Sequence, residues 1–260
     1  HLCDRRQRQM CIRDRNKTGA SIGKFGVGFK AVFQYTQTPH IYDPNFKFKI
    51  ERFIVPIMLT DDFPGRRSDE TLFAFPFDHQ ERDADEAYSD ISDKLRNLSF
   101  PLLFLTSLKD IEFEFSNVLG LYGKNIKETI KLDGTIAEHL ILTQNAGDDL
   151  YDEDLWLFSR LDECERRYSV GFFMDKEGHL RPVNEPAFCF FPTKEVTNLN
   201  FILHAPFLLT DSREGIRAGV AHNDKMIKRL AELAADSMEY LRDIGCLLYT
   251  SDAADDRISV

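Results

Sequence analysis

Alternating apolar and polar residues predict several half-buried strands along the chain. The alternation is clearest at residues 46–51 and 111–115, where it has the period of two that is typical of a strand. Residues 54–59 form another candidate, in which Pro56 lacks a ladder N–H and favours an edge position. Further strands are expected at 71–77, 102–105, 127–132, 139–142, 155–158, 168–174, 188–191 and 199–204.

Helical spacing of apolar residues predicts three helices. The first begins near Phe29 and stops before Pro39, and a short amphipathic one is ended by Pro101. The last follows Asn223, a candidate N-cap, and ends at Gly245, a candidate C′ residue. Its expected apolar face consists of Ile227, Leu230, Ala231, Ala234, Met238 and Leu241.

A glycine-rich segment stands directly before the first predicted helix. Gly23, Gly26 and Gly28 lie within six residues. Glycines let backbone N–H groups approach a ligand, and the helix dipole adds partial positive charge there. The segment therefore suits phosphate, although a tight turn followed by a packed helix would produce the same pattern.

The motif IGKFGVGFKAVF at 22–33 resembles the second glycine box of the GHKL ATPase superfamily, most closely that of the ninety-kilodalton heat-shock chaperones and sacsin-type ATPases. The resemblance implies that this box closes over ATP and that Gly23 and Phe25 belong to the ATP-binding residues. The N–H groups of Gly26, Val27, Gly28 and Phe29 would then contact the β- and γ-phosphates. Lys24 would add positive charge, or it is an ordinary solvated lysine.

The same resemblance gives roles to two more residues. Thr71 falls where the family has a strand threonine near adenine, although its strand propensity alone would explain it. The segment 207–216, which contains Ser-Arg-Glu at 212–214, resembles the chaperone middle-domain segment whose arginine reaches the γ-phosphate. Arg213 would be that catalytic residue, or it forms a surface ion pair.

Other family elements have no counterpart in this sequence. The general-base glutamate, the asparagine that binds Mg²⁺ and the adenine-reading aspartate are expected upstream of Asn16. The cofactors implied are ATP and Mg²⁺, the latter without a ligand residue in this chain. The fragment alone is therefore expected to bind ATP weakly at best and to be inactive.

Both ends of the chain are expected to be non-native. Residues 5–15 and 246–256 can be encoded by the two strands of one DNA element that resembles a sequencing-library adapter. Residues 1–15 and 246–260 are therefore assigned to adapter-derived segments that do not pack on the core. The natural part is expected to be an internal fragment spanning 16–245.

Composition narrows the classes of partner. The net charge of −10 without a basic block argues against a duplex nucleic-acid surface, and no apolar run is long enough to cross a membrane. Cys164 and Cys189 are expected to be buried free thiols, which fits a reducing, cytoplasmic location. The acidic stretch 148–154 lacks EF-hand spacing and is expected to be a solvated loop.

The fold class expected is α+β. The C-terminal half of a GHKL (Bergerat-type) α/β sandwich at 16–115 would precede a chaperone-middle-like α/β domain at 116–245. The function expected is that of a chaperone-like ATPase fragment whose lid couples ATP binding to conformational change, with self-association and an unknown client in the parent. Three alternatives remain: a non-hydrolysing nucleotide-gated scaffold, a histidine kinase or MutL-type repair protein, and a structural α/β protein with an accidental glycine turn.

Overall fold

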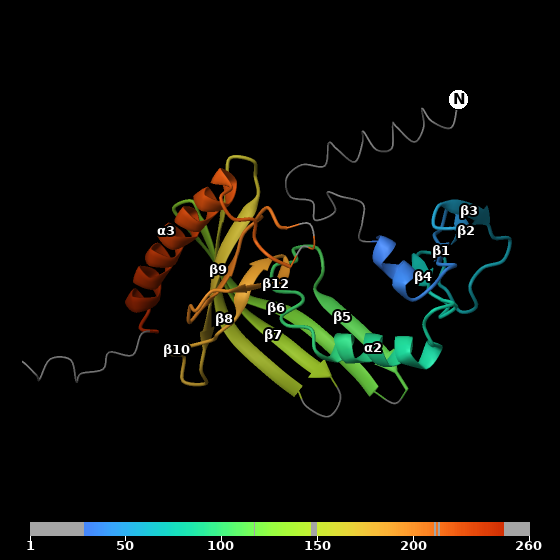
Figure 1. Ribbon diagram of the computed structural model, residues 1–260. Coiled ribbons are helices and arrows are strands. Elements are labelled where there is room, and N and C mark those ends of the chain that lie inside the picture. Colours follow the sequence, from blue (N-terminus) through green and yellow to red (C-terminus); the bar gives the residue numbers. More distant parts are fainter. Residues whose placement is uncertain (1–28, 117, 147–149, 211, 213, 247–260) are drawn as a thin grey trace, which may run out of the picture. The chain divides into compact units, whose positions relative to one another are not determined.

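The computed structural model describes residues 29–116, 118–146, 150–210, 212 and 214–246 (Figure 1). They form two compact units, and the boundary between the units along the sequence lies between Asn97 and Leu98. This division lies earlier than the expected domain boundary at 115/116. The reason is that residues 110–115 form a strand paired with the large sheet of the second unit.

The first unit contains a small antiparallel sheet in the order β3-β2-β1-β4. Its strands are β1 (His40–Tyr42), β2 (Lys47–Glu51), β3 (Val55–Met58) and β4 (Leu72–Ala74). The edge position of β3 confirms the prediction from Pro56. A 3₁₀ helix, η1 (Phe29–Gln34), precedes β1 and occupies the place of the first predicted helix.

The helix α2 (Ala84–Arg96) completes the first unit. The Asp83 carboxylate caps it by accepting the Asp85 N–H at 3.0 Å, so the helix begins within the charged stretch rather than near its apolar residues. The Asp90 carboxylate on α2 accepts the Tyr35 hydroxyl at 2.8 Å, which fastens the helix to the end of η1.

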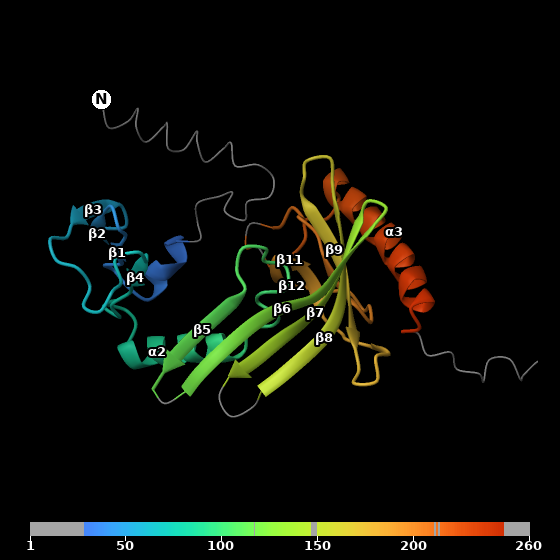
Figure 2. The ribbon, with the colours of Figure 1, turned by 180° about the vertical axis from the view of Figure 1, so that it is seen from behind.

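The second unit is built on a nine-stranded sheet in the order β12-β11-β13-β9-β8-β7-β6-β5, with β10 paired to β9 (Figure 2). Neighbouring strands are antiparallel except for β11 and β13. The strands are β5 (Asp110–Phe115), β6 (Val118–Leu132), β7 (Thr135–Ala146), β8 (Leu150–Leu161), β9 (Arg167–Met174), β10 (Leu180–Arg181), β11 (Pro186–Cys189), β12 (Phe191–Val196) and β13 (Ile202–His204).

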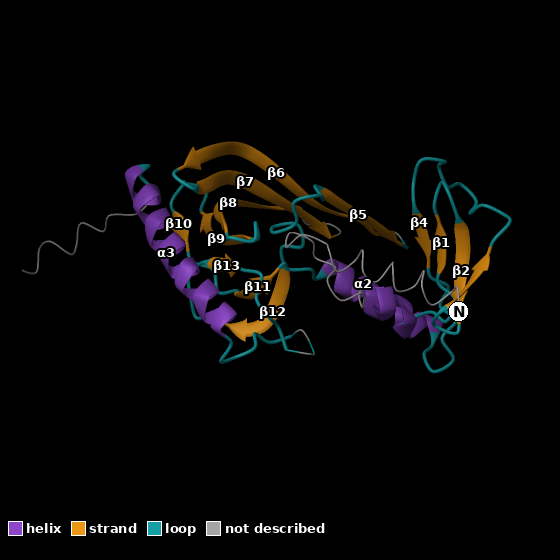
Figure 3. Ribbon diagram, turned by 90° about the horizontal axis from the view of Figure 1, so that it is seen from above, coloured by secondary structure: helices purple, strands orange, loops and turns teal. Residues whose placement is uncertain are grey.

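One face of this sheet packs against the long helix α3 (Ala221–Asp243), as Figure 3 shows. Trp156, Phe158 and Phe172 from the strands meet Leu230 and Leu233 from the helix in the main core. The expected helix face was partly wrong. The buried residues are Asn223, Met226, Leu230, Leu233, Ser237 and Leu241, whereas Ile227 is 55% exposed and Met238 37% exposed.

The opposite face of the sheet carries a second core, which includes Leu155, Phe173 and Ile202. Leu103 and Phe104 pack into it from residues 100–105, which form successive turns, so the predicted strand at 102–105 was wrong. The Lys124 ammonium supports these turns by donating to the Leu102 carbonyl at 2.9 Å and to that of Leu105. A short apolar run therefore marked burial correctly but not the backbone conformation.

Other expectations also need correction. Residues 150–154 belong to β8 and not to a solvated loop, while 147–149 lie outside the described residues. Cys164 is exposed in a turn, and Cys189 is a half-buried free thiol. Cys246 is 9% exposed and packs on the core, although it was assigned to a non-packing end. The rest of both ends lies outside the described residues.

None of the helices in the described part of the chain combines the length and apolar character that spanning a bilayer requires.

Candidate functional site

Most of the expected phosphate site lies outside the described residues. This applies to Gly23, Lys24, Phe25, Gly26, Val27 and Gly28, and in the second unit to Arg213. Phe29 and Thr71 are described, and both belong to the first unit.

Phe29 begins η1 and lies in an aromatic cluster. Its ring centroid is 6.3 Å from that of Phe33, 6.3 Å from that of Phe73 and 6.4 Å from that of Phe75. Phe73 is part of β4, so these contacts fix the first residue after the glycine segment against that strand. Phe29, the first residue after the glycine segment, therefore has a defined place on the first sheet.

Thr71 directly precedes β4 and lies two residues from Phe73. Strand alternation puts Thr71 on the same side as Phe73, so the structure brings the two described site residues, Phe29 and Thr71, to one face of the sheet. The Thr71 hydroxyl donates to Asp43 Oδ2 at 3.0 Å across the end of the β1–β4 pair. The expected site thus has a polar end that sequence reasoning missed, because Asp43 and Thr71 are far apart in the chain.

Hydrogen bonds keep Asp43 ionised. The Asn45 N–H lowers the pKa of the Asp43 carboxyl most, and the Thr71 hydroxyl, the Asn45 side chain and the Arg66 charge act in the same direction against the effect of burial. A fixed carboxylate beside a threonine hydroxyl can accept a hydrogen bond from an amino group. It would repel a phosphate, so this end suits an uncharged group that offers hydrogen-bond donors.

The two basic side chains near the Thr71–Asp43 pair, Arg66 and Lys47, both bind the Asp62 carboxylate. Arg66 makes a fork to Asp62, with distances of 2.7 and 2.8 Å, and also donates to the Glu70 carbonyl at 2.5 Å. Lys47 adds an ion pair to Asp62 at 2.8 Å. Because its charge and donors are used on these partners, Arg66 holds the segment between β3 and β4 in place.

The turn after η1 is anchored by Asp78. The Asp78 carboxylate accepts the Thr36 hydroxyl at 3.1 Å, the Gln37 N–H at 2.6 Å and the Thr38 hydroxyl at 2.6 Å. Burial by itself would raise the pKa of Asp78, but these bonds, led by that of Thr38, bring it below its usual range. Both ends of η1 are therefore tied to the segment around β4.

The described neighbours of Arg213 form a turn closed at its base. The Thr210 N–H donates to the Gly215 carbonyl at 2.8 Å, and Leu209 bridges Ile216. Glu214 pairs with Lys194 at 2.8 Å. Glu214, the described residue that follows position 213 in the sequence, is thus held against β12.

Asn223 supports the same segment from α3. Its Oδ1 accepts the Leu208 N–H at 2.8 Å, and its Nδ2 donates to the carbonyls of Leu208 and Arg217 at 2.9 and 2.8 Å. The expected N-cap role was wrong, because Val220 is the N-cap and Asn223 uses its side chain on these partners. Asn223 instead clamps the two chain segments that flank position 213.

His204 is a buried titratable residue that sequence reasoning did not single out. It is 1% exposed and lies between the rings of Phe104 and Phe190, with centroid distances of 4.6 and 4.9 Å. Burial lowers the pKa of His204 from 6.5 to about 4, so it is neutral at pH 7. The sequence did offer a signal for this burial, because His204 lies two residues after the apolar Ile202 on an expected strand and therefore shares its face.

No protein-family model matches the chain, and no solved structure matches it. The chain is 25% identical, over 261 aligned positions, to the protein called Protein NO VEIN of Arabidopsis thaliana. That alignment covers 85% of this chain but only 9% of the plant protein, so the chain spans about a tenth of that protein's length. The similarity is weak and does not by itself define a family.

Proposed function

We propose that the chain contains the phosphate-binding lid of a GHKL-type nucleotide site, followed by a chaperone-middle-like unit. The observation that carries this proposal is the glycine segment 23–28 placed directly before η1, whose first residue packs on β4 two residues from Thr71. The glycine segment would supply backbone N–H groups to phosphates, and the Thr71–Asp43 pair would face the nucleoside.

In this proposal ATP is the ligand, and the change of lid position on binding is the output. Hydrolysis would also need a general base and a Mg²⁺ ligand beside the γ-phosphate, and the resemblance places both upstream of Asn16. Arg213 would stabilise charge on the transferring phosphoryl group in the parent protein, because a guanidinium matches phosphate oxygens with two donors. The aromatic contacts of Phe29 support a lid with a fixed C-terminal hinge.

Equilibrium binding tests the proposal. A fluorescent ATP analogue with Mg²⁺ should bind the chain weakly, and Gly26→Val or Gly28→Val should abolish the signal by blocking the approach of phosphate. Gly123→Val is the matched control, because a Cβ there meets Asp110 and Thr143 at ordinary distances of 3.6 and 3.7 Å on a strand. Equal binding by all four proteins would refute the phosphate role.

A further inference from the structure

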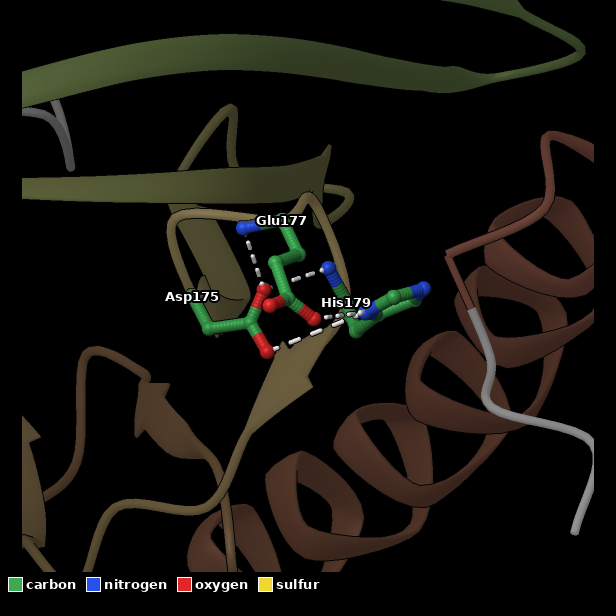
Figure 4. Close-up of side chains that lie close together, drawn as sticks. All are labelled: Asp175, Glu177 and His179. Atoms are coloured by element: carbon green, nitrogen blue, oxygen red, sulfur yellow. Dashed lines mark hydrogen bonds and ion pairs between the residues drawn. The ribbon is translucent and has the colours of Figure 1, made fainter.

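The turn between β9 and β10 gathers three side chains of the kinds that bind metal ions. Asp175, Glu177 and His179 place their ligand atoms within 4.8 Å of one another (Figure 4). They alternate along the chain as i, i+2 and i+4, and Figure 4 shows the two carboxylates and the imidazole turned toward a common point. This cluster lies in the second unit and has no part in the proposed nucleotide site.

The backbone of the turn holds these residues in place. The Asp175 N–H donates to the His179 carbonyl at 2.8 Å, and the Gly178 N–H donates to the Asp175 carbonyl at 3.2 Å. Gly178 has a φ of +87°, which a glycine adopts without strain. The turn continues β9, a buried strand near the middle of the sheet, so its base is rigid.

The two oxygens of Asp175 have separate tasks. Oδ1 accepts the N–H groups of Glu177 and His179, both at 2.9 Å. Oδ2 is left facing the His179 ring. Carboxylates that bind metal ions are commonly held in place by hydrogen bonds in this way.

The decisive atom is His179 Nδ1. This atom is inaccessible to solvent, although the His179 side chain is 28% exposed, and it has no hydrogen-bond partner among the described residues. It lies 3.8 Å from Asp175 Oδ2 and 3.7 Å from Glu177 Oε2, beyond the range of about 2.7–3.2 Å for a hydrogen bond.

These separations suit a small cation shared by the three groups. Two zinc–ligand bonds of about 2.1 Å at a tetrahedral angle separate the donor atoms by about 3.4 Å. The two distances from His179 Nδ1, 3.8 and 3.7 Å, are a few tenths of an ångström longer than this, and all three ligand atoms lie within 4.8 Å of one another. One imidazole nitrogen with two carboxylate oxygens suits zinc, whereas calcium and magnesium prefer oxygen ligands alone.

We propose that the β9–β10 turn binds one zinc-class divalent cation through Asp175 Oδ2, Glu177 Oε2 and His179 Nδ1, with water in the fourth position. Binding requires the His179 ring to be neutral, with its proton on Nε2. The ion gives the Nδ1 atom the partner it otherwise lacks and neutralises the two carboxylates.

The chain offers a matched control of the same composition. His79, Glu81 and Asp83 have the same spacing in reverse order in the first unit. There, however, His79 Nδ1 faces the Glu81 N–H at 3.2 Å, and Asp83 is used as the cap of α2. His79→Gln should therefore leave zinc binding unchanged.

Calorimetric titration of the tag-free, metal-free chain with zinc tests the proposal. We expect one site that is lost, or at least tenfold weaker, in Asp175→Asn and in His179→Gln. Asp175→Asn retains an Oδ1 acceptor for the two N–H groups, so the turn should persist, and an unchanged thermal midpoint of the metal-free variant would confirm this. Calcium and magnesium should give at least a hundredfold weaker binding.

Zinc can also bind to the cysteines, of which the chain has five. Binding that is unaffected by both variants would assign the ion to such sites and overturn the proposal. No zinc binding, or an equal loss in His79→Gln, would also overturn it. Amide NMR shifts confined to residues 174–181 on zinc addition would support it.

Discussion

Lowering the pH should destabilise the second unit through His204. The folded unit keeps this ring neutral because it is enclosed by Phe104 and Phe190, and Arg167 adds an unfavourable charge. Its Nδ1 lies 3.3 Å from both the Phe190 nitrogen and the Phe188 oxygen, while Nε2 has no partner among the described groups. Protonation therefore places a charge where the fold provides little compensation.

The size of the effect follows from the two pKa values. The unfolded chain takes up this proton near pH 6.5, whereas the folded unit takes it up only near pH 4. Stability is therefore lost as the pH falls from 6.5 to 4. Linkage gives a loss of about 2 kcal/mol by pH 5 and about 3 kcal/mol at the lower limit.

Urea unfolding monitored by tryptophan fluorescence measures this loss of stability in the second unit, which contains His204. The chain has one tryptophan, Trp156, and it is buried in the core of the second unit. His204→Asn removes the titration while keeping an acceptor near the position of Nδ1. The free energy of unfolding of this variant should fall by about 2 kcal/mol less than that of the wild type between pH 7 and pH 5. Parallel curves for the two proteins would refute the reasoning, and His79→Asn in the first unit should follow the wild type.

Three other predictions concern single substitutions. Asn223→Ala removes three hydrogen bonds from a residue that is 2% exposed, and should lower the free energy of unfolding of the second unit by about 2–4 kcal/mol in the same assay; a loss below about 0.5 kcal/mol would contradict the clamp. Gly171→Ala puts a Cβ 2.7 Å from Ile202 Cγ2 and should cost about 1–3 kcal/mol in urea unfolding, whereas Gly123→Ala should cost less. In a longer natural protein that supplies the general base, Arg213→Ala should lower the rate of ATP hydrolysis by about 10³-fold with little change in ATP affinity; an unchanged rate in a phosphate-release assay would remove its proposed role.

Sequence patterns predicted several strands well, both half-buried strands with alternating residues and the buried strand β9 with a continuous apolar run. The alternation at 46–51 and 111–115 corresponds to β2 and β5, and the run at 168–174 corresponds to β9. Pro56 correctly indicated an edge strand, and Gly245, with a φ of +83°, follows the end of α3 as expected. These features depend on local backbone chemistry, which the sequence contains directly.

Features that depend on distant partners could not be predicted. Asp154 looked like part of a solvated loop, but in β8 its carboxylate lies 2.5 Å from His139 Nε2 on the adjacent strand β7 and forms an ion pair at 2.9 Å with Lys127 on β6. The expected strand at 188–191 is interrupted at Phe190, which has a φ of +66°, and the chain reverses there from β11 to β12. Nothing near Phe190 in the sequence marks such a turn.

The candidate site shows the same division. The glycine segment and Thr71 were found from a motif and a resemblance, but the Asp43 partner of Thr71 depends on strand pairing between β1 and β4. The cluster at Asp175, Glu177 and His179 was not predicted, because the direction of its side chains depends on the bonds that Asp175 accepts.

The most direct test of the nucleotide proposal is an amide NMR titration of the chain with Mg²⁺-ATP, compared with the Gly26→Val variant. The proposal predicts saturable shifts at residues 23–29 and at Thr71 and Asp43 in the wild type, and their absence in the variant. Shifts that avoid these residues, or that persist unchanged in Gly26→Val, would contradict it.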